Sequence, residues 1–181
     1  MKTKLSAAIA LAAFGFAAIS NPVGAAISNP ATATFQVLIT ITKACTVTAG
    51  ATSDINLGTV DATVAVGTSN TNTIKVQCSN KTPYNIALQS TNNASTAGLG
   101  TLKGVTAGNT DTLGYQLYSN AGLSTVWGNS GVTGTTTGNG LAGTGNGAVQ
   151  NVSVYAKVVS ATPALVTPDA YNDTVTVSVY Y

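Results

Sequence analysis

Residues 173–181 read Asp-Thr-Val-Thr-Val-Ser-Val-Tyr-Tyr, so apolar and polar side chains alternate through the closing run of the chain. A two-residue period places one set of side chains on a buried face and the other set in solvent. This arrangement is typical of a half-buried antiparallel strand. The run therefore predicts a final strand whose inward residues are Val175, Val177, Val179 and Tyr181.

The same period recurs along most of the chain. Apolar residues share one face of four further segments: Ile74, Val76 and Cys78; Tyr84, Ile86 and Leu88; Leu113, Tyr115 and Leu117; and Val152, Val154, Ala156 and Val158. Another strand is expected at Thr125-Val126-Trp127, and Leu57–Val66 and Thr101–Val105 are weaker candidates. No segment after residue 25 shows a convincing helical period. About seven short strands separated by turn residues predict an all-β fold, a β-sandwich.

The composition removes most catalytic chemistry. Hydrophobic residues make up 44% of the 181 residues and charged residues only 7%; the seven basic residues are all Lys and the five acidic ones all Asp. Without His there is no Ser-His-Asp or Cys-His arrangement and no imidazole metal ligand. Without Arg there is no bidentate grip on a phosphate. We therefore expect no catalytic, metal or cofactor site.

The carboxylates are expected at strand ends and turns, where Asp caps the local backbone. They are Asp54, Asp61, Asp111, Asp169 and Asp173. The region 128–147, dense in Gly, Thr and Asn, is expected to be the least structured. It contains a formal GxGxxG pattern at 138–143. A dinucleotide site needs a helix after this pattern, whereas 148–159 is predicted to be a strand. The match is therefore interpreted as accidental.

The first 25 residues have the pattern of a secretory signal peptide. Lys2 and Lys4 precede an apolar stretch from Leu5 to Ile19, and small residues follow, with cleavage expected after Ala25 or Ala26. A membrane anchor is the alternative, but the apolar stretch is shorter than the ~20 residues that span a bilayer. Removal of 1–25 leaves five Lys against five Asp. No basic patch for nucleic acid then remains.

Export makes the two cysteines informative. A secreted protein with only two Cys most simply joins them, here Cys45 to Cys78. The alternative is two free thiols, one of them catalytic. An oxidising compartment, and the lack of a His to lower a thiol pKa, argue against it.

A second amphipathic run precedes the first cysteine. Within Ala31–Thr42, one face carries Ala33, Phe35, Val37, Ile39 and Ile41. An immunoglobulin-like sandwich ordinarily has one more strand beside its penultimate strand. If 173–181 is the sixth strand, the sandwich has a cleft that exposes its core and unpaired backbone groups. A spare strand before the sandwich and a missing one after it suggest subunits completed head to tail by donor-strand complementation, which builds a fibre.

The chain resembles the spore coat protein U/Csu-type pilin family, secreted subunits of archaic chaperone–usher pili. Four segments carry the likeness: residues 74–78 (Ile-Lys-Val-Gln-Cys) with Pro83-Tyr84; residues 113–118 (Leu-Gly-Tyr-Gln-Leu-Tyr); residues 125–128 (Thr-Val-Trp-Gly); and residues 171–177 (Tyr-Asn-Asp-Thr-Val-Thr-Val). The resemblance implies an incomplete immunoglobulin-like fold that lacks its last strand. It also implies a periplasmic chaperone, an outer-membrane usher and a disulfide between Cys45 and Cys78.

The expected organisation is a signal peptide at 1–25, a donor-strand segment at 26–44 and a pilin domain at 45–181. The favoured hypothesis is a structural subunit of a surface pilus of a Gram-negative bacterium, used in adhesion and biofilm formation. Its partners would be other copies or related subunits, the chaperone and the usher. The chaperone or a neighbouring subunit would pair with the final strand through Val175, Val177, Val179 and Tyr181. The alternative is a secreted monomeric coat or binding protein whose residues 26–44 fold back and cover that strand.

Overall fold

A computed structural model describes residues 29–61, 69–159 and 165–181. The expected signal peptide, residues 1–25, lies outside the described residues, as does part of the candidate strand Leu57–Val66. The chain divides into two units between Ile39 and Thr40. No helix within the described ranges has the length and apolar character needed to cross a bilayer.

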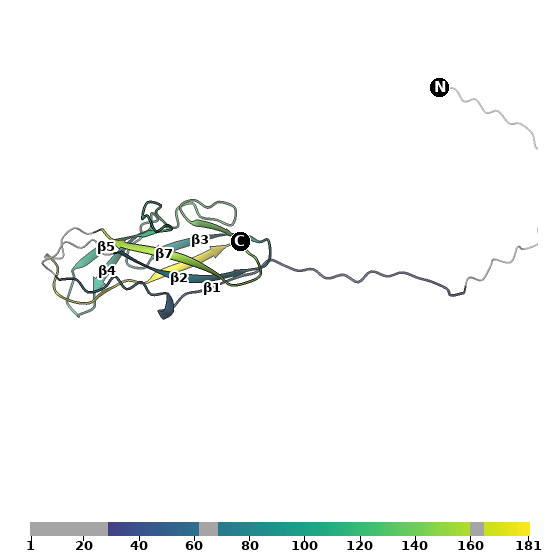
Figure 1. The fold of residues 1–181 in the computed structure, drawn as a ribbon, viewed down its shortest axis with the longest axis horizontal. Coiled ribbons are helices and arrows are strands. Elements are labelled where there is room, and N and C mark those ends of the chain that lie inside the picture. The colour runs from purple at the N-terminus through teal and green to yellow at the C-terminus, as the bar shows by residue number, and fades with distance from the viewer. Residues whose placement is uncertain (1–28, 62–68, 160–164) are drawn as a thin grey trace, which may run out of the picture. The chain divides into compact units, whose positions relative to one another are not determined.

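The unit from Thr40 to Tyr181 is built from two antiparallel sheets (Figure 1). The larger sheet has six strands in the order β1 (Cys45–Thr48), β2 (Ser69–Cys78), β7 (Gln150–Val158), β5 (Thr112–Tyr118), β4 (Leu99–Gly104) and β8 (Tyr171–Asn172). The smaller sheet has three, in the order β6 (Leu141–Thr144), β3 (Pro83–Ser90) and β9 (Val175–Tyr180). A short 3-10 helix, η1 (Ala51–Ser53), follows β1. The all-β prediction is confirmed.

The core lies between the two sheets and is made by the alternating positions that the sequence singled out. Buried side chains from β2, β3, β5 and β7 form one cluster: Ile74, Val76, Cys78, Tyr84, Ile86, Leu88, Tyr115, Leu117, Val154 and Ala156. Trp127 is fully buried among them, and its indole Nε1 donates to the carbonyl oxygen of Ile86 at 2.9 Å. Each fully buried large side chain of this kind stabilises the fold by about 1.5–3 kcal/mol.

Two strand predictions, at residues 125–127 and in the weaker candidate Leu57–Val66, differ from the structure. In the segment 125–127, Val126 forms only an isolated bridge with Tyr118, made by the Trp127 N–H bond to the Leu117 carbonyl at 2.9 Å and the Ser119 N–H bond to the Thr125 carbonyl at 3.0 Å. The described part of the Leu57 candidate, residues 57–61, forms no strand. The candidate at Thr101–Val105 is confirmed, since β4 covers Leu99–Gly104.

The expectation that residues 128–147 are the least structured is wrong. Residues 141–144 form β6, which pairs with β3, and the preceding loop covers the outer face of β3. The Asn85 Nδ2 atom donates to the Thr133 carbonyl at 2.8 Å, and the Thr137 hydroxyl donates to Asn85 Oδ1 at 2.9 Å. The loop approaches so closely that a Cβ at Gly140 would lie 2.5 Å from the Ile86 carbonyl oxygen. Glycine is needed here for contact with the sheet, and it does not mark disorder.

Candidate assembly groove

The final strand has a free edge. β9 pairs with β3 from Asn85–Tyr180 to Ser90–Val175, and no other described strand pairs with it. Val175, Val177 and Val179 are half-buried and pack against the core. Tyr181 lies beyond the end of β9 and is half exposed, so it does not share their buried face. The unpaired backbone groups of β9 are therefore available for another strand.

An apolar cavity of about 270 Å³ lies beside this free edge. Its lining includes Asp173, Thr174, Val175 and Val177 at and just before the start of β9, which we call one wall, and residues drawn from 49–57, which we call the other wall. The floor is formed by core side chains of β2, β3, β4, β5 and β7: Ile74, Leu88, Leu102, Tyr115, Leu117, Val154 and Ala156. A second cleft of about 800 Å³ shares Asp54, Leu102 and Asp173 with the cavity and continues toward β8. We call the cavity and this cleft together the groove.

The wall at residues 49–57 is held without a backbone ladder. Beyond Thr48 the pairing of β1 with β2 ends, and two asparagine side chains of β2 take over. Asn72 Nδ2 donates to the carbonyls of Thr52 (3.1 Å) and Asp54 (2.7 Å), and Asn70 Nδ2 donates to that of Asn56 (2.6 Å). Paired strands lie about 4.8 Å apart. Asparagine side chains keep this wall farther from β2 than a ladder would.

One carboxylate that lines the groove accepts hydrogen bonds from side chains of both sheets. Asp173 accepts hydrogen bonds from the hydroxyl of Tyr115, at 2.9 Å, and from that of Ser90. Burial raises the pKa of Tyr115 above its usual value of 10, and the bond to Asp173 raises it further. The phenol therefore remains protonated and can donate.

Besides Asp173, two further aspartates, Asp111 and Asp169, bond residues distant in the sequence, which corrects the expectation that they cap only the local backbone. Asp111 accepts from the backbone and hydroxyl of Thr167, and Asp169 accepts from Thr106 and Asn109. These partners lie 56 to 63 positions away along the chain. Alternation shows which strands exist, but it does not show which turns meet. Within the described ranges, no three His, Cys, Asp or Glu side chains come together as a possible metal site.

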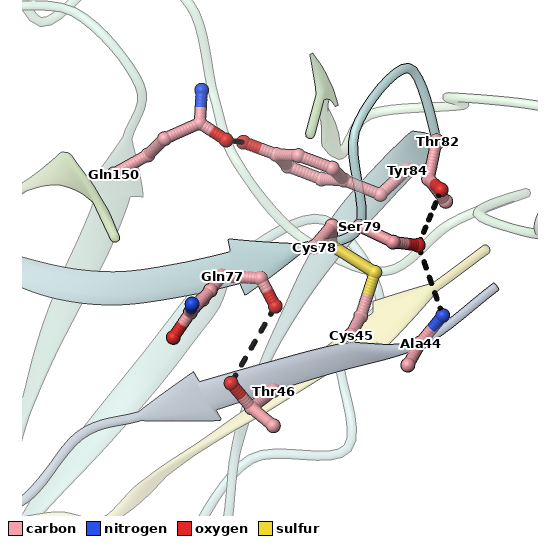
Figure 2. Close-up of a disulfide and its surroundings, with 9 residues drawn as sticks. All are labelled: Ala44, Cys45, Thr46, Gln77, Cys78, Ser79, Thr82, Tyr84 and Gln150. Carbon is pink, nitrogen blue, oxygen red and sulfur yellow. Dashed lines mark hydrogen bonds between the residues drawn. A yellow bond between two sulfur atoms is a disulfide. The ribbon is translucent and has the colours of Figure 1, made fainter. Parts of the chain in front are cut away.

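The predicted disulfide is present. Cys45 and Cys78 are directly opposite in the β1–β2 ladder, with their Cα atoms 4.0 Å apart, and their sulfur atoms are bonded. Figure 2 shows the hydrogen bonds around it: Ala44 N donates to Ser79 Oγ at 3.1 Å, and the hydroxyls of Ser79 and Thr82 lie 2.8 Å apart. The bridge anchors the chain where it enters the sandwich.

The amphipathic run before the first cysteine forms no strand. Residues 31–44 have no ladder partner, so the strand predicted at Ala31–Thr42 is absent in this single chain. Its apolar side chains are exposed: Phe35, Val37 and Ile39 by 87% each and Ile41 by 84%, with Ala33 exposed as well. A strand needs a partner for its backbone groups. A solvent-exposed apolar run of this kind marks a site of interaction.

Sequence reasoning missed the residues that shape the groove. Asn70 and Asn72 lie on the same face of β2 as the buried Ile74, Val76 and Cys78, at the end of the strand where Asn72 is half-buried and Asn70 is exposed. Polar residues at inward positions are a signal that could have identified them. Asp173 offered no such signal, because its partners belong to three other parts of the sequence.

The Spore Coat Protein U domain family matches this chain over residues 31–178. Among solved structures, a chain of the CsuC–CsuE chaperone–tip adhesion subunit pre-assembly complex, from archaic chaperone-usher Csu pili of Acinetobacter baumannii, has a similar fold. The TM-score is 0.51 at 22% identity, over 78% of this chain and 40% of that chain. The likeness supports the predicted incomplete immunoglobulin-like sandwich. No curated protein matches the chain in sequence.

Proposed function

Because this chain belongs to the Spore Coat Protein U domain family, we propose that it is a structural subunit of a bacterial surface pilus assembled by the chaperone–usher pathway. The observation that carries the proposal is the apolar cavity of the groove, which is lined by the start of β9, a strand with an unpaired edge. A groove of this kind fits an added strand, and the chain carries a candidate strand of its own in residues 31–42. The role is structural, and it requires no cofactor.

Polymerisation follows if the run of one copy fills the groove of the next. Phe35, Val37, Ile39 and Ile41 would enter the groove, with Ala33 at a shallower position. Burial of four such side chains contributes a gross gain of roughly 6–12 kcal/mol at 1.5–3 per residue. Ladder hydrogen bonds add to this gain, and the entropy of ordering the run subtracts from it. The contact is heterologous and does not close, so it extends into a fibre.

Before assembly, the groove needs a temporary cover. We propose a periplasmic chaperone that pairs with the free edge of β9 and is replaced by a neighbouring subunit at an outer-membrane usher. Val175, Val177 and Val179 already pack on the subunit's own core. The chaperone would thus bind the backbone edge and cover these side chains. The assembled pilus would lie on the surface of a Gram-negative cell and serve adhesion and biofilm formation.

The test is a charge placed on one face of the donor run. Ile39→Asp would put an unpaired carboxylate into an apolar groove, at a cost of several kcal/mol. Thr40→Asp, the matched control, puts the same charge on the opposite face. Each variant is expressed with its chaperone and usher, and surface fibres are examined by electron microscopy and gel analysis. We expect fibres from Thr40→Asp and none from Ile39→Asp.

Normal fibres from Ile39→Asp, or from a chain that lacks residues 31–41, would eliminate this run as the donor strand. The alternative, a monomeric coat or binding protein that fills its own groove, needs residues 26–44 to pair with β9. The described residues 29–44 form no strand, so no observation favours this alternative.

A further inference from the structure

The chain crosses from the larger sheet to the smaller one through a two-residue link that begins with Asp173. β8 pairs with β4 in the larger sheet through Asn172, and β9 begins in the smaller sheet at Val175. Asp173 and Thr174 are the only residues between the two strands. Asp173 also lines both the cavity and the neighbouring cleft, so it stands where the groove wall begins.

The carboxylate of Asp173 is bonded to both sheets at once. From the smaller sheet, the Ser90 hydroxyl at the end of β3 donates to Oδ2. From the larger sheet, the Tyr115 hydroxyl of β5 donates at 2.9 Å and the Thr101 N–H of β4 at 3.4 Å. Oδ1 accepts the N–H groups of Asn92, at 3.1 Å, and of Thr174, at 2.7 Å. Five donors therefore meet one carboxylate, which is an acceptor-only group when ionised.

An open groove has a physical tendency to close. Its apolar floor gains free energy from any movement that removes it from water. The nearest cover is the start of β9, where Val175 and Val177 already line the cavity. The hydrophobic effect is non-directional and favours such a shift, whereas hydrogen bonds at fixed angles oppose it.

We infer that Asp173 is a positioning residue that keeps the groove open for the incoming strand by tying the start of β9 to both sheets. The inference rests on the proposed function, because it assigns a role in the acceptance of a partner strand. Asp173 would not contact the incoming strand itself. It would hold Val175 and Val177 at the rim of the groove. Without it, the rim would move inward, and the groove would accept a strand slowly.

The probe is a fluorescent peptide with the sequence of residues 31–42, added to the secreted chain purified as a monomer. Peptide uptake is followed by native gel and fluorescence anisotropy, at a temperature where circular dichroism shows every variant to be folded. Asp173→Asn preserves shape but turns an amide toward five donors. We expect its uptake to be at least tenfold slower than that of the wild type.

Asp111→Asn is the matched control. It removes the same charge and breaks two hydrogen bonds to Thr167, but Asp111 lines neither the cavity nor the cleft. We expect its uptake to match the wild type even if its thermal midpoint falls. If Asp173→Asn does not fold, the double variant Ser90→Ala/Tyr115→Phe replaces it, since it removes two donors and retains the ring of Tyr115.

The outcomes distinguish the role of Asp173 from the proposed function. Slow peptide uptake by Asp173→Asn, or by the double variant that replaces it (together the groove variants), with normal uptake by Asp111→Asn supports the inference. Equal uptake by wild type and groove variants overturns it and leaves the proposed function intact, as does equal slowing of the control, which would show loss of stability alone. A wild-type chain that neither takes up the peptide nor forms polymers would overturn the proposed function and this inference together.

Discussion

At the scale of single residues, carboxylates connect turns that are far apart in the sequence. Asp169 accepts from Asn109 Nδ2 at 2.8 Å and from the Thr106 N–H at 2.9 Å. The hydrogen bond from Asn109 is the largest cause that lowers the pKa of Asp169 from 3.8 to about 2, and the bond from the Thr106 backbone is the next. The ionised form of Asp169 is therefore the form that the fold stabilises.

This pKa shift predicts a dependence of stability on pH. A carboxyl group whose folded pKa is lowered stabilises the protein above its unfolded pKa, and it loses that contribution as the pH falls through the folded value. The thermal midpoint of Asp169→Asn should thus lie below that of the wild type at neutral pH. The gap should narrow between about pH 4 and pH 2. Calorimetry of both proteins across this pH range measures the difference between their thermal midpoints. A difference that stays constant with pH would contradict a lowered pKa of Asp169.

At the scale of elements, the disulfide compensates for a short ladder. β1 has four residues and, among the described strands, pairs only with β2, so few backbone bonds hold it. Beyond it, the chain depends on the side chains of Asn70 and Asn72. The bridge between Cys45 and Cys78 joins this weakly paired edge to the most buried part of β2.

Loss of the bridge should lower stability by an amount set by the closed loop. The two cysteines are separated by 33 positions, and closing a loop of this size stabilises by about 3–4 kcal/mol in the chain-entropy model. We expect Cys45→Ser/Cys78→Ser to lose roughly this much free energy of unfolding in urea. The wild type under reducing conditions is the control and should fall by a similar amount. Two reactive thiols in native, unreduced wild type would contradict the bridge itself.

At the scale of the whole unit from Thr40 to Tyr181, a loop adds a third layer to the sandwich. Residues 129–140 cover the outer face of β3, where Asn85 and Ala87 are buried although they point away from the core. β3 is thus enclosed on both faces. This position explains why its burial is nearly continuous, in contrast to the alternation expected of a half-exposed strand.

Removal of the Asn85 side chain should detach the loop 129–140 from the outer face of β3. Asn85→Ala breaks the bonds with Thr133 and Thr137 and should cost about 1–3 kcal/mol, because polar groups lose their partners. Cleavage by a non-specific protease should increase within 129–140, as read by mass spectrometry. Asn146→Ala, which removes only a local bond to Ala148, is the control. Equal resistance of Asn85→Ala and wild type would show that the loop does not depend on Asn85.

Much of the fold follows from local patterns. Alternation identifies β2, β3, β5, β7 and β9, since a half-buried strand needs only its own side chains to signal its two faces. The bridge between Cys45 and Cys78 is predicted by the cysteine count together with the expected signal peptide. The amphipathic run at 31–42 predicts a donor strand, which stays a prediction; among the residues that the structure describes, the run has no strand partner.

The shape of the groove was decided only by the tertiary structure. Asn70 and Asn72 reach carbonyls 14 to 20 positions away, and Asp173 collects donors from residues up to 83 positions away. The Gly-rich loop is ordered by Asn85, which lies some 50 positions earlier. Alternation is a local property of a strand, so it reports which face is buried. Which polar group meets which depends on how the sheets are stacked, and the stacking is set by the packing of the whole core.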